Sequence, residues 1–202
     1  QGSLFANTTA SNNTAVGYVA LNANTTGTNN VAVGAFALND NTTANNNSAL
    51  GYNAARNLTT GSENTAIGRS ALDQSTTAAS CVAVGYQSLY YNTDGGENTA
   101  VGKNALVNNT TAHNNTSVGY HSLHENTTGS ENTAVGALAL DANITGHSNT
   151  AVGYLSLSAD TEGNRNVAVG FHAGQSQDNA DDNVWVGYQS GLSCTTGGSN
   201  TG

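Results

Sequence analysis

An uninterrupted repeat of 17 residues is the feature that most constrains the fold. Eleven units cover residues 13–199 with no insertion or deletion, and residues 200–202 begin a further unit. Residues 1–12 are a partial repeat, in which residues 1–3 also fit the remnant of a cleaved tag. A period kept without insertions predicts that every unit occupies the same slot in a stack, as in a solenoid. The repeat is marked by the glycines Gly17, Gly34, Gly51, Gly68, Gly85, Gly102, Gly119, Gly136, Gly153, Gly170 and Gly187.

The consensus unit, N-T-A-V-G-Y-x-A-L-x-x-N-T-T-G-S-E, favours strands. Asn, Thr, Gly and Val are poor helix formers, and no period of 3.6 residues is present. A chain rich in Asn, Thr, Ser and Gly also suits disorder, but the strict repeat argues against it. We therefore expect an all-β protein, a parallel β-roll or β-solenoid with one unit per coil and coils about 4.8 Å apart.

Stacking turns each position of the unit into a column of side chains. The fourth column is apolar throughout (Val16, Val33 and onward) and the ninth is mostly leucine, so both are expected to face a core. The first column is asparagine in ten of eleven units, which predicts amide ladders between coils. The third column is Ala or Ser up to Trp185. Because one coil has a thin interior, this small-residue face predicts a close contact between chains in a homotrimer, with a monomeric solenoid as the alternative.

The sixth column adds a period of 34 residues, which glutamates of the last column share at Glu63, Glu97 and Glu131. Arg69 and Lys103 fall between tyrosines of the sixth column, within expected cation–π reach. An exposed file of this kind is either amphipathic surface packing or an aromatic stripe for sugars or another filament. Its tyrosines are Tyr18, Tyr52, Tyr86, Tyr120, Tyr154 and Tyr188.

Composition excludes several functions. Four Lys and Arg against 13 Asp and Glu give a net charge of −9, which excludes a basic nucleic-acid footprint. No apolar run is long enough for a membrane-spanning helix, so no membrane insertion is expected, and no signal peptide is visible. The chain has no Met, which predicts a processed or excised piece of a longer protein.

Little in the sequence indicates catalysis or a cofactor, and we expect no enzyme. His121 and His124 lack the helical frame of a zinc motif and are expected to be solvated. Cys81 and Cys194 are too far apart to pair within one chain, and each is expected to be a small buried residue, with a disulfide between chains as the alternative. The acidic turn with Asp178, Asn179, Asp181 and Asp182 suits a solvated surface, with a Ca²⁺ site shared around a three-fold axis as the alternative.

Two polar motifs of the repeat suggest further hypotheses, ice binding and N-glycosylation. Recurring Thr pairs suggest an ice-binding grid, but adjacent strand residues point to opposite faces, so each pair exposes only one Thr. Candidate N-glycosylation sequons lie at Asn7, Asn24, Asn41, Asn57, Asn109, Asn126 and Asn143.

The strings that begin at Asn13 and Asn132, N-T-A-V-G-Y-V-A-L and N-T-A-V-G-A-L-A-L, resemble the head repeats of YadA-like trimeric autotransporter adhesins. They are more similar still to the repeat arrays of phage-type tail-fibre proteins and related bacterial surface proteins. The resemblance implies a trimeric parallel β-roll whose second and fourth positions, such as Thr14 and Val16 or Val31 and Val33, face the core.

Together these patterns predict a non-enzymatic segment, shaft or head, of an extracellular, cell-surface or virion fibre that serves adhesion as a rigid spacer. The alternative is a carbohydrate-binding or cell-surface-binding adhesin head that uses the tyrosine stripe. An ice-binding solenoid is the third reading. The expected partners are further copies of the chain, as a homotrimer or a longer filament, and a surface glycan or receptor.

Overall fold

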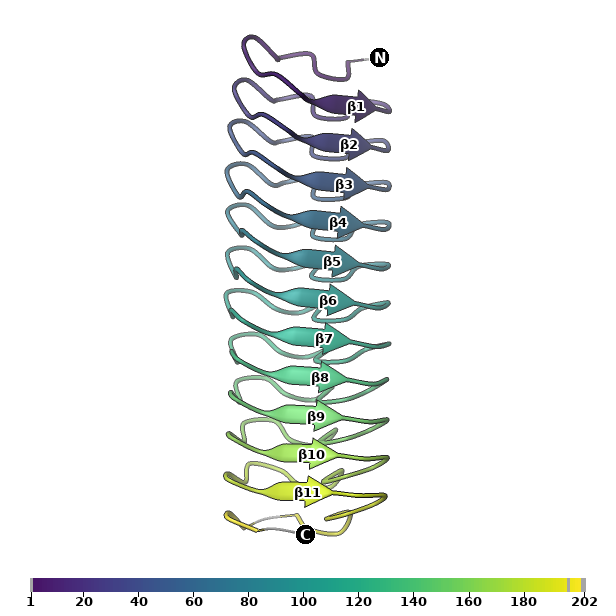
Figure 1. Ribbon diagram of the computed structural model, residues 1–202, viewed down its shortest axis with the longest axis vertical. Helices are drawn as coiled ribbons and strands as arrows, with labels where there is room; N and C mark the ends of the chain where they lie inside the picture. Colours follow the sequence, from purple (N-terminus) through teal and green to yellow (C-terminus); the bar gives the residue numbers. More distant parts are fainter. Residues whose placement is uncertain (1, 196, 201–202) are drawn as a thin grey trace.

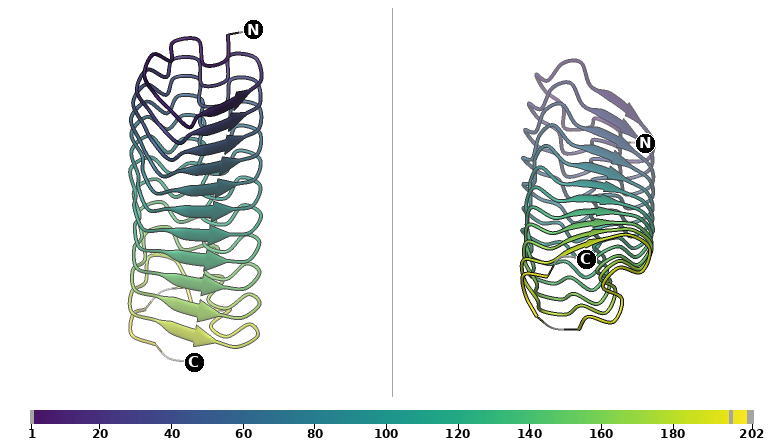
Figure 2. Two further views of the ribbon diagram at one scale, coloured as in Figure 1. Left: turned by 45° about the horizontal axis from the view of Figure 1, so that its top comes forward. Right: turned by 60° about the horizontal axis from the view of Figure 1, so that its bottom comes forward.

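The computed structural model describes residues 2–195 and 197–200, which form a single stack of coils that rises along one axis (Figure 1). It is all-β, with no helix among the described residues. Gln1, Thr201 and Gly202, which belong to the tag remnant and the further repeat predicted above, lie outside the described residues. Equivalent segments of successive coils lie above one another and form continuous walls (Figure 2).

Each unit contributes one three-residue strand to a single parallel sheet of eleven strands. Every strand pairs with the next at an offset of one unit, so that Thr14 pairs with Val31 and Ala15 with Ala32. This register confirms one coil per 17-residue unit. The strands are β1 (Thr14–Val16), β2 (Val31–Val33), β3 (Ser48–Leu50), β4 (Thr65–Ile67), β5 (Val82–Val84), β6 (Thr99–Val101), β7 (Thr116–Val118), β8 (Thr133–Val135), β9 (Thr150–Val152), β10 (Val167–Val169) and β11 (Val184–Val186).

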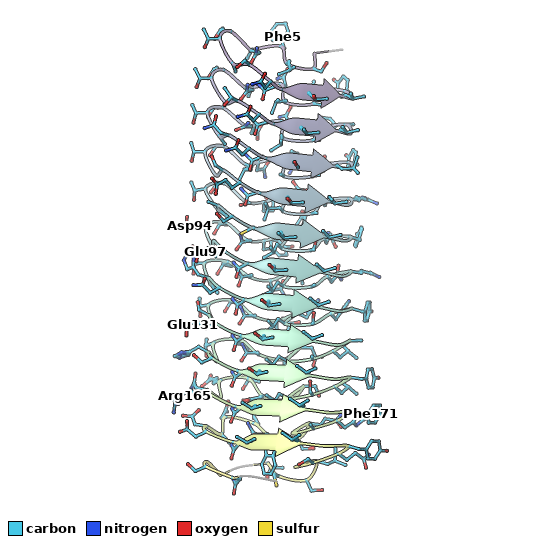
Figure 3. The ribbon with its side chains drawn as sticks, viewed as in Figure 1. Phe5, Asp94, Glu97, Glu131, Arg165 and Phe171 are labelled. Carbon is cyan, nitrogen blue, oxygen red and sulfur yellow. The ribbon has the colours of Figure 1, made fainter. Side chains whose placement is uncertain are left out.

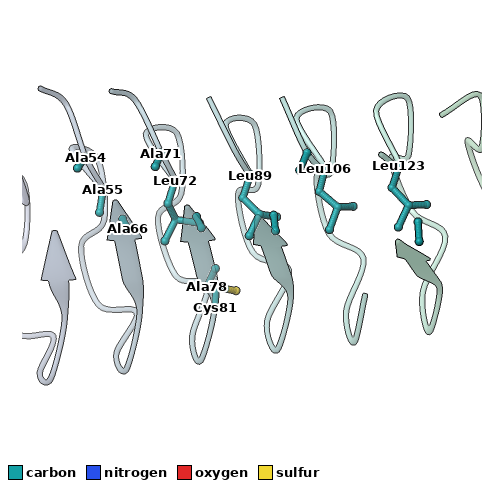
Figure 4. Close-up of a cluster of buried hydrophobic side chains, with 14 of the residues drawn as sticks. Ala54, Ala55, Ala66, Ala71, Leu72, Ala78, Cys81, Leu89, Leu106 and Leu123 are labelled. Atoms are coloured by element: carbon teal, nitrogen blue, oxygen red, sulfur yellow. The ribbon is translucent and has the colours of Figure 1, made fainter. Parts of the chain in front are cut away.

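The core of the coil is built from the third, eighth and ninth columns. Ala66 in β4 and Leu72 on the opposite wall are both fully buried, and the same pair recurs along the stack (Figure 4). The prediction that the fourth column faces this core is wrong, since Val16 is 59% exposed and Leu50 is 51% exposed. The prediction that the alanine column contacts a second chain is also wrong, because these alanines are buried inside their own coil. The leucine column already fills the space beneath the sheet, which leaves room only for a methyl group.

The recurring glycine is required both by its positive φ and by the close approach of the next coil. Gly17 has φ of 138°, and a Cβ on it would lie 2.5 Å from the carbonyl oxygen of Gly34 in the next coil. Other turns are left-handed at residues with side chains, which the sequence does not predict. Leu21 and Leu38 of the ninth column have φ of 51° and 48°, a conformation that is uncommon outside Gly, Asn and Asp.

Two buried amide ladders tie the coils together. In the first column, the backbone N–H of Asn47 donates to Oδ1 of Asn30 at 2.9 Å, which confirms the predicted ladder. A second ladder, not predicted, follows the twelfth column: the side-chain amide of Asn109 donates to Oδ1 of Asn92 at 2.7 Å. Buried polar groups are tolerated only when they are hydrogen-bonded, so these ladders make the stacking register specific.

Near the carboxyl end, where the repeat departs from the consensus, small residues replace large ones in one core column and a large residue replaces a small one in another. Gly174 and Gly191 replace leucine in the ninth column, and the indole of Trp185, which replaces alanine in β11, fills the space they leave. A Cβ on Gly174 would lie 2.8 Å from Cδ1 of this indole. The substitutions at the end of the array therefore preserve a packed core.

Candidate functional site

The outward face of the eleven-stranded sheet is the most distinctive surface of the molecule. Alternation along each strand turns the second and fourth columns outward while the third points inward. The second column carries Thr, Val or Ser and the fourth Val, Leu or Ile; Val31 is 41% exposed and Ile67 is 39% exposed. We call this surface the sheet face. It is apolar apart from hydroxyl groups and has no charged residue on its strands.

The sixth column borders the sheet face on one side, and we call it the aromatic file. All six of its tyrosines are exposed, from 39% at Tyr86 to 73% at Tyr188, so the predicted exposed file is confirmed. Near the carboxyl end the rings of Tyr154, Phe171 and Tyr188 stack at centroid distances of 5.5 and 5.4 Å. In this last part of the stack, a continuous aromatic ridge thus lies beside the sheet face.

Two cations interrupt the aromatic file where the sequence predicted them. The guanidinium of Arg69 lies 5.9 and 5.8 Å from the ring centroids of Tyr52 and Tyr86. The ammonium of Lys103 lies 6.0 and 5.7 Å from those of Tyr86 and Tyr120. Within residues 2–195 and 197–200, neither cation has a carboxylate partner, whereas the other two cations of the chain, Arg56 and Arg165, both pair with aspartates.

The last column of the unit borders the sheet face on the other side, and we call it the acidic file. Glu97, Glu131 and Arg165 lie along this edge, and Phe171 of the aromatic file lies at the opposite edge (Figure 3). Glu63, Glu97 and Glu131 are exposed, one on every second coil. The intervening coils carry Ser or Asn; the hydroxyl of Ser148, for example, donates to Oε2 of Glu131 at 3.0 Å.

The acidic turn near the carboxyl end is engaged in internal contacts. Asp178 accepts hydrogen bonds from Thr161, and Asp181 accepts one from the backbone of Asn164 at 2.7 Å. Arg165 donates to both oxygens of Asp182 and holds the pKa of that carboxyl below its usual range. Among the described residues no three His, Cys, Asp or Glu side chains are grouped as metal ligands, and no pocket is present.

The histidines and cysteines have separate environments. The rings of His121 and His124 stack at 4.4 Å, and burial, followed by the neighbouring His124 and Lys103, lowers the pKa of His121. Both cysteines are free. Cys81 is buried, which raises the pKa of its thiol to about 11. Cys194 is exposed, so the expectation that it is buried is wrong.

Burial argues against most of the candidate glycosylation sites. Five of these asparagines belong to the twelfth-column ladder and are fully buried, so their amide nitrogens cannot carry a glycan in the folded coil: Asn24, Asn41, Asn109, Asn126 and Asn143. Asn7 and Asn57 are half-buried and also form side-chain hydrogen bonds.

Among the residues that the structure describes, the Thr pairs form no free grid of hydroxyl groups. The first Thr of a pair donates its hydroxyl to a backbone carbonyl of the next coil, as Thr25 does to Thr42 at 3.0 Å. These hydroxyl groups therefore stabilise the stack, and the pairs leave one row of Thr directed to solvent.

Comparison of the chain with family models, with curated proteins and with solved structures gives no match. No helix in the described part of the chain is long and apolar enough to cross a membrane.

Proposed function

We propose that this chain is a rigid structural segment of an extracellular or virion fibre, where it acts as a spacer for adhesion. The observation that carries the proposal is the parallel ladder of eleven strands, which runs the length of the stack with the same register at every step. Because each coil is hydrogen-bonded to its neighbours by backbone, asparagine and threonine groups, bending would break many bonds together. At about 4.8 Å per strand the ladder makes a rod roughly 53 Å long.

The sheet face supports self-association as part of this function. Two outward residues per strand over eleven strands cover roughly 350 Å², and the exposed tyrosines of the aromatic file extend this surface. Apolar patches larger than a few hundred Å² mark interaction sites, and about 800 Å² per partner is typical of a stable interface. The fourth-column side chains point away from their own coil, so the core that the family resemblance implies would be shared between chains. A homotrimer with three sheet faces turned toward one axis would provide such a core.

The state of association and the stiffness of the rod test this proposal. Sedimentation velocity and native mass spectrometry should give a trimer, and small-angle scattering should give a rod whose length does not change with mild heating or added protease. A chain that sediments as a monomer at high micromolar concentration would refute the self-associating fibre.

A carbohydrate-binding head is a second candidate because all six tyrosines of the aromatic file are exposed. Flat aromatic rings can stack on the apolar faces of sugars. A glycan array tests it with the double variant Tyr86→Ala and Tyr120→Ala, which leaves the buried alanine and leucine columns unchanged. Binding by the wild type that the variant loses would support this role, and the absence of any glycan binding would oppose it.

A further inference from the structure

The two borders of the sheet face carry opposite charges at the same heights along the stack. Glu63 and Arg69 lie two residues before and two residues after β4, and Glu97 and Lys103 lie two residues before and two residues after β6. The two residues of each pair are therefore on one coil, at opposite ends of its strand. The distance between them, about 20 Å for six extended residues, prevents a contact within one chain.

Neighbouring coils carry a different and also complementary pair. The odd-numbered strands β3, β5, β7 and β9 have Asn46, Ser80, Asn114 and Ser148 at the acidic border and a tyrosine of the aromatic file at the other. A tyrosine hydroxyl can exchange a hydrogen bond with Asn or Ser. The coils of β4 and β6 thus offer an anion and a cation, and the coils of β3, β5, β7 and β9 offer two neutral hydrogen-bonding groups. Beyond this central part the pattern changes, since Glu131 lies opposite Ala137 at β8 and Arg165 opposite Phe171 at β10.

From this match we infer that the acidic file of one copy docks against the aromatic file of a second copy, with the coils of the two copies at equal height. The inference rests on the proposed self-association and specifies its contacts: Glu63 meets Arg69 of the neighbour, and Glu97 meets Lys103 of the neighbour. One border meets the other, so the contact is heterologous, and repeated rotation without axial rise closes a ring. In a ring of three, the borders meet at the corners of a triangle whose sides are the sheet faces.

Displaced arrangements fit less well. A shift of one coil sets each glutamate against a tyrosine and each cation against Asn or Ser, which leaves the charges unpaired. A shift of two coils again pairs Glu97 with Arg69 and Glu131 with Lys103, but it exposes two sheet layers at each end and cannot close a ring. Exposed ion pairs add little affinity, whereas like charges placed opposite each other are costly. The charges therefore exclude one-coil displacements, ring closure excludes two-coil displacements, and the apolar sheet face provides the affinity.

Charge reversal tests the contacts. The variant R69E/K103E places Glu opposite Glu and has a net charge of −13, since each of two substitutions changes −9 by −2. The variant E63K/E97K places cations opposite cations and has a net charge of −5 by the same arithmetic. We expect sedimentation velocity to show at least tenfold weaker association for both variants. The fourfold variant that carries all these exchanges should associate like the wild type.

Because the two variants change the net charge in opposite directions, comparing them distinguishes the effect of local ion pairs from general repulsion between chains. If overall charge governed association, E63K/E97K would associate more tightly than the wild type, and that result would overturn the inference. Disulfide cross-linking in a Cys194→Ser background tests the alignment: E97C/K103C should cross-link copies, and E97C/R69C should not. The reverse result would also overturn the equal-height alignment.

The remaining outcomes are equally decisive. A wild type that is monomeric would refute the proposed self-association and this inference with it. A wild-type trimer that neither charge reversal affects would refute the inference alone and leave the proposed fibre intact. If R69E/K103E stayed trimeric but lost retention on heparin, the aromatic file would belong to an acidic polysaccharide rather than to a second copy.

Discussion

Asp160 interrupts a buried amide ladder, and its replacement by asparagine is expected to stabilise the protein. In this ladder the side-chain amide of Asn126 donates to Asn109 at 2.9 Å, and that of Asn143 donates to Asn126 at 2.8 Å. Asp160 takes the next position and has no N–H when ionised. Oδ1 of Asn143 is consequently left buried with no hydrogen-bond partner among the described residues. The variant D160N would supply the missing donor.

The expected gain follows from the groups involved. A buried acceptor left without a partner costs about 1–3 kcal/mol. Asp160 also accepts hydrogen bonds from Asn166 and Gln177 at 3.1 and 3.3 Å. Both donors reach the carbonyl of Ala180 as well, so their loss would be partial. We expect D160N to raise the free energy of unfolding at neutral pH by about 1–3 kcal/mol, or roughly 2–4 °C in Tm for each kcal/mol.

The pH dependence identifies the cause. Burial raises the pKa of Asp160 in the folded chain above its usual value of 3.8. The folded protein therefore binds this proton more tightly than the unfolded chain, and the wild type gains stability as the pH falls through the raised pKa. A protonated Asp160 could also donate to Asn143. The advantage of D160N should thus be largest at neutral pH and smallest below 3.8.

Thermal melts followed by circular dichroism across this pH range provide the measurement. The matched control is Asn126→Asp, which introduces the same interruption into an intact part of the ladder. It should lose stability at neutral pH and recover part of it in acid. The reasoning fails if D160N melts at or below the wild type at neutral pH, or if the difference between them does not change with pH.

Three other substitutions test the packing and the turns. Ala100→Leu should overpack the interior of its own coil and lower the free energy of unfolding by about 1–3 kcal/mol. The adjacent outward change Val101→Leu should leave the chemical-denaturation midpoint of the monomer nearly unchanged. Equal effects of the two variants would contradict the assignment of Ala100 to the inner face and Val101 to the outer face. Trp185→Ala should open a cavity and lower the free energy of unfolding by about 3–5 kcal/mol. Adding Gly191→Leu to this variant should restore part of the Tm. No recovery of the Tm would contradict the interpretation that the indole fills the space left by this glycine. Gly119→Ala should lower the Tm strongly, because a φ of 146° is strained for a residue with a side chain. The new Cβ would also collide with the carbonyl of Gly136. An unchanged Tm would contradict this reasoning and show that the coil relaxes around the added methyl group.

Much of the coil could be predicted from the period alone. The 17-residue interval gave one unit per coil, a parallel register and the stacked asparagines, because an array without insertions repeats its hydrogen bonds at every step. The exposed tyrosines and the positions of Arg69 and Lys103 also followed from the 34-residue spacing. These features depend only on which residues share a column.

The direction that each column faces could not be predicted in the same way. Alternation places Val16 and Ala15 on opposite sides of β1 but does not say which side is inside. Size usually decides, since larger apolar residues are more often buried, and here size misled because Leu21 from the opposite wall already fills the coil. Both faces of a Val-Ala-Val strand are apolar, so the pattern does not show which face is exposed to solvent. Only the depth of the coil, which depends on the left-handed turn around Leu21, determines that the methyl group points inward.

The spacing of charge along the borders has a physical consequence for any assembly of these rods. A glutamate on every coil would lie about 4.8 Å from its copies, and placing it on alternate coils doubles the distance and roughly halves the repulsion. It also makes even and odd coils different. A border with the same charge on every coil would match a neighbour equally well after any one-coil displacement, so rods could slide past one another. With Glu97 and Lys103 on even coils and tyrosines on odd ones, each one-coil displacement unpairs every charge at once. Alternation therefore lowers repulsion within a chain and opposes slippage between chains, although the backbone and the apolar face repeat identically at every coil.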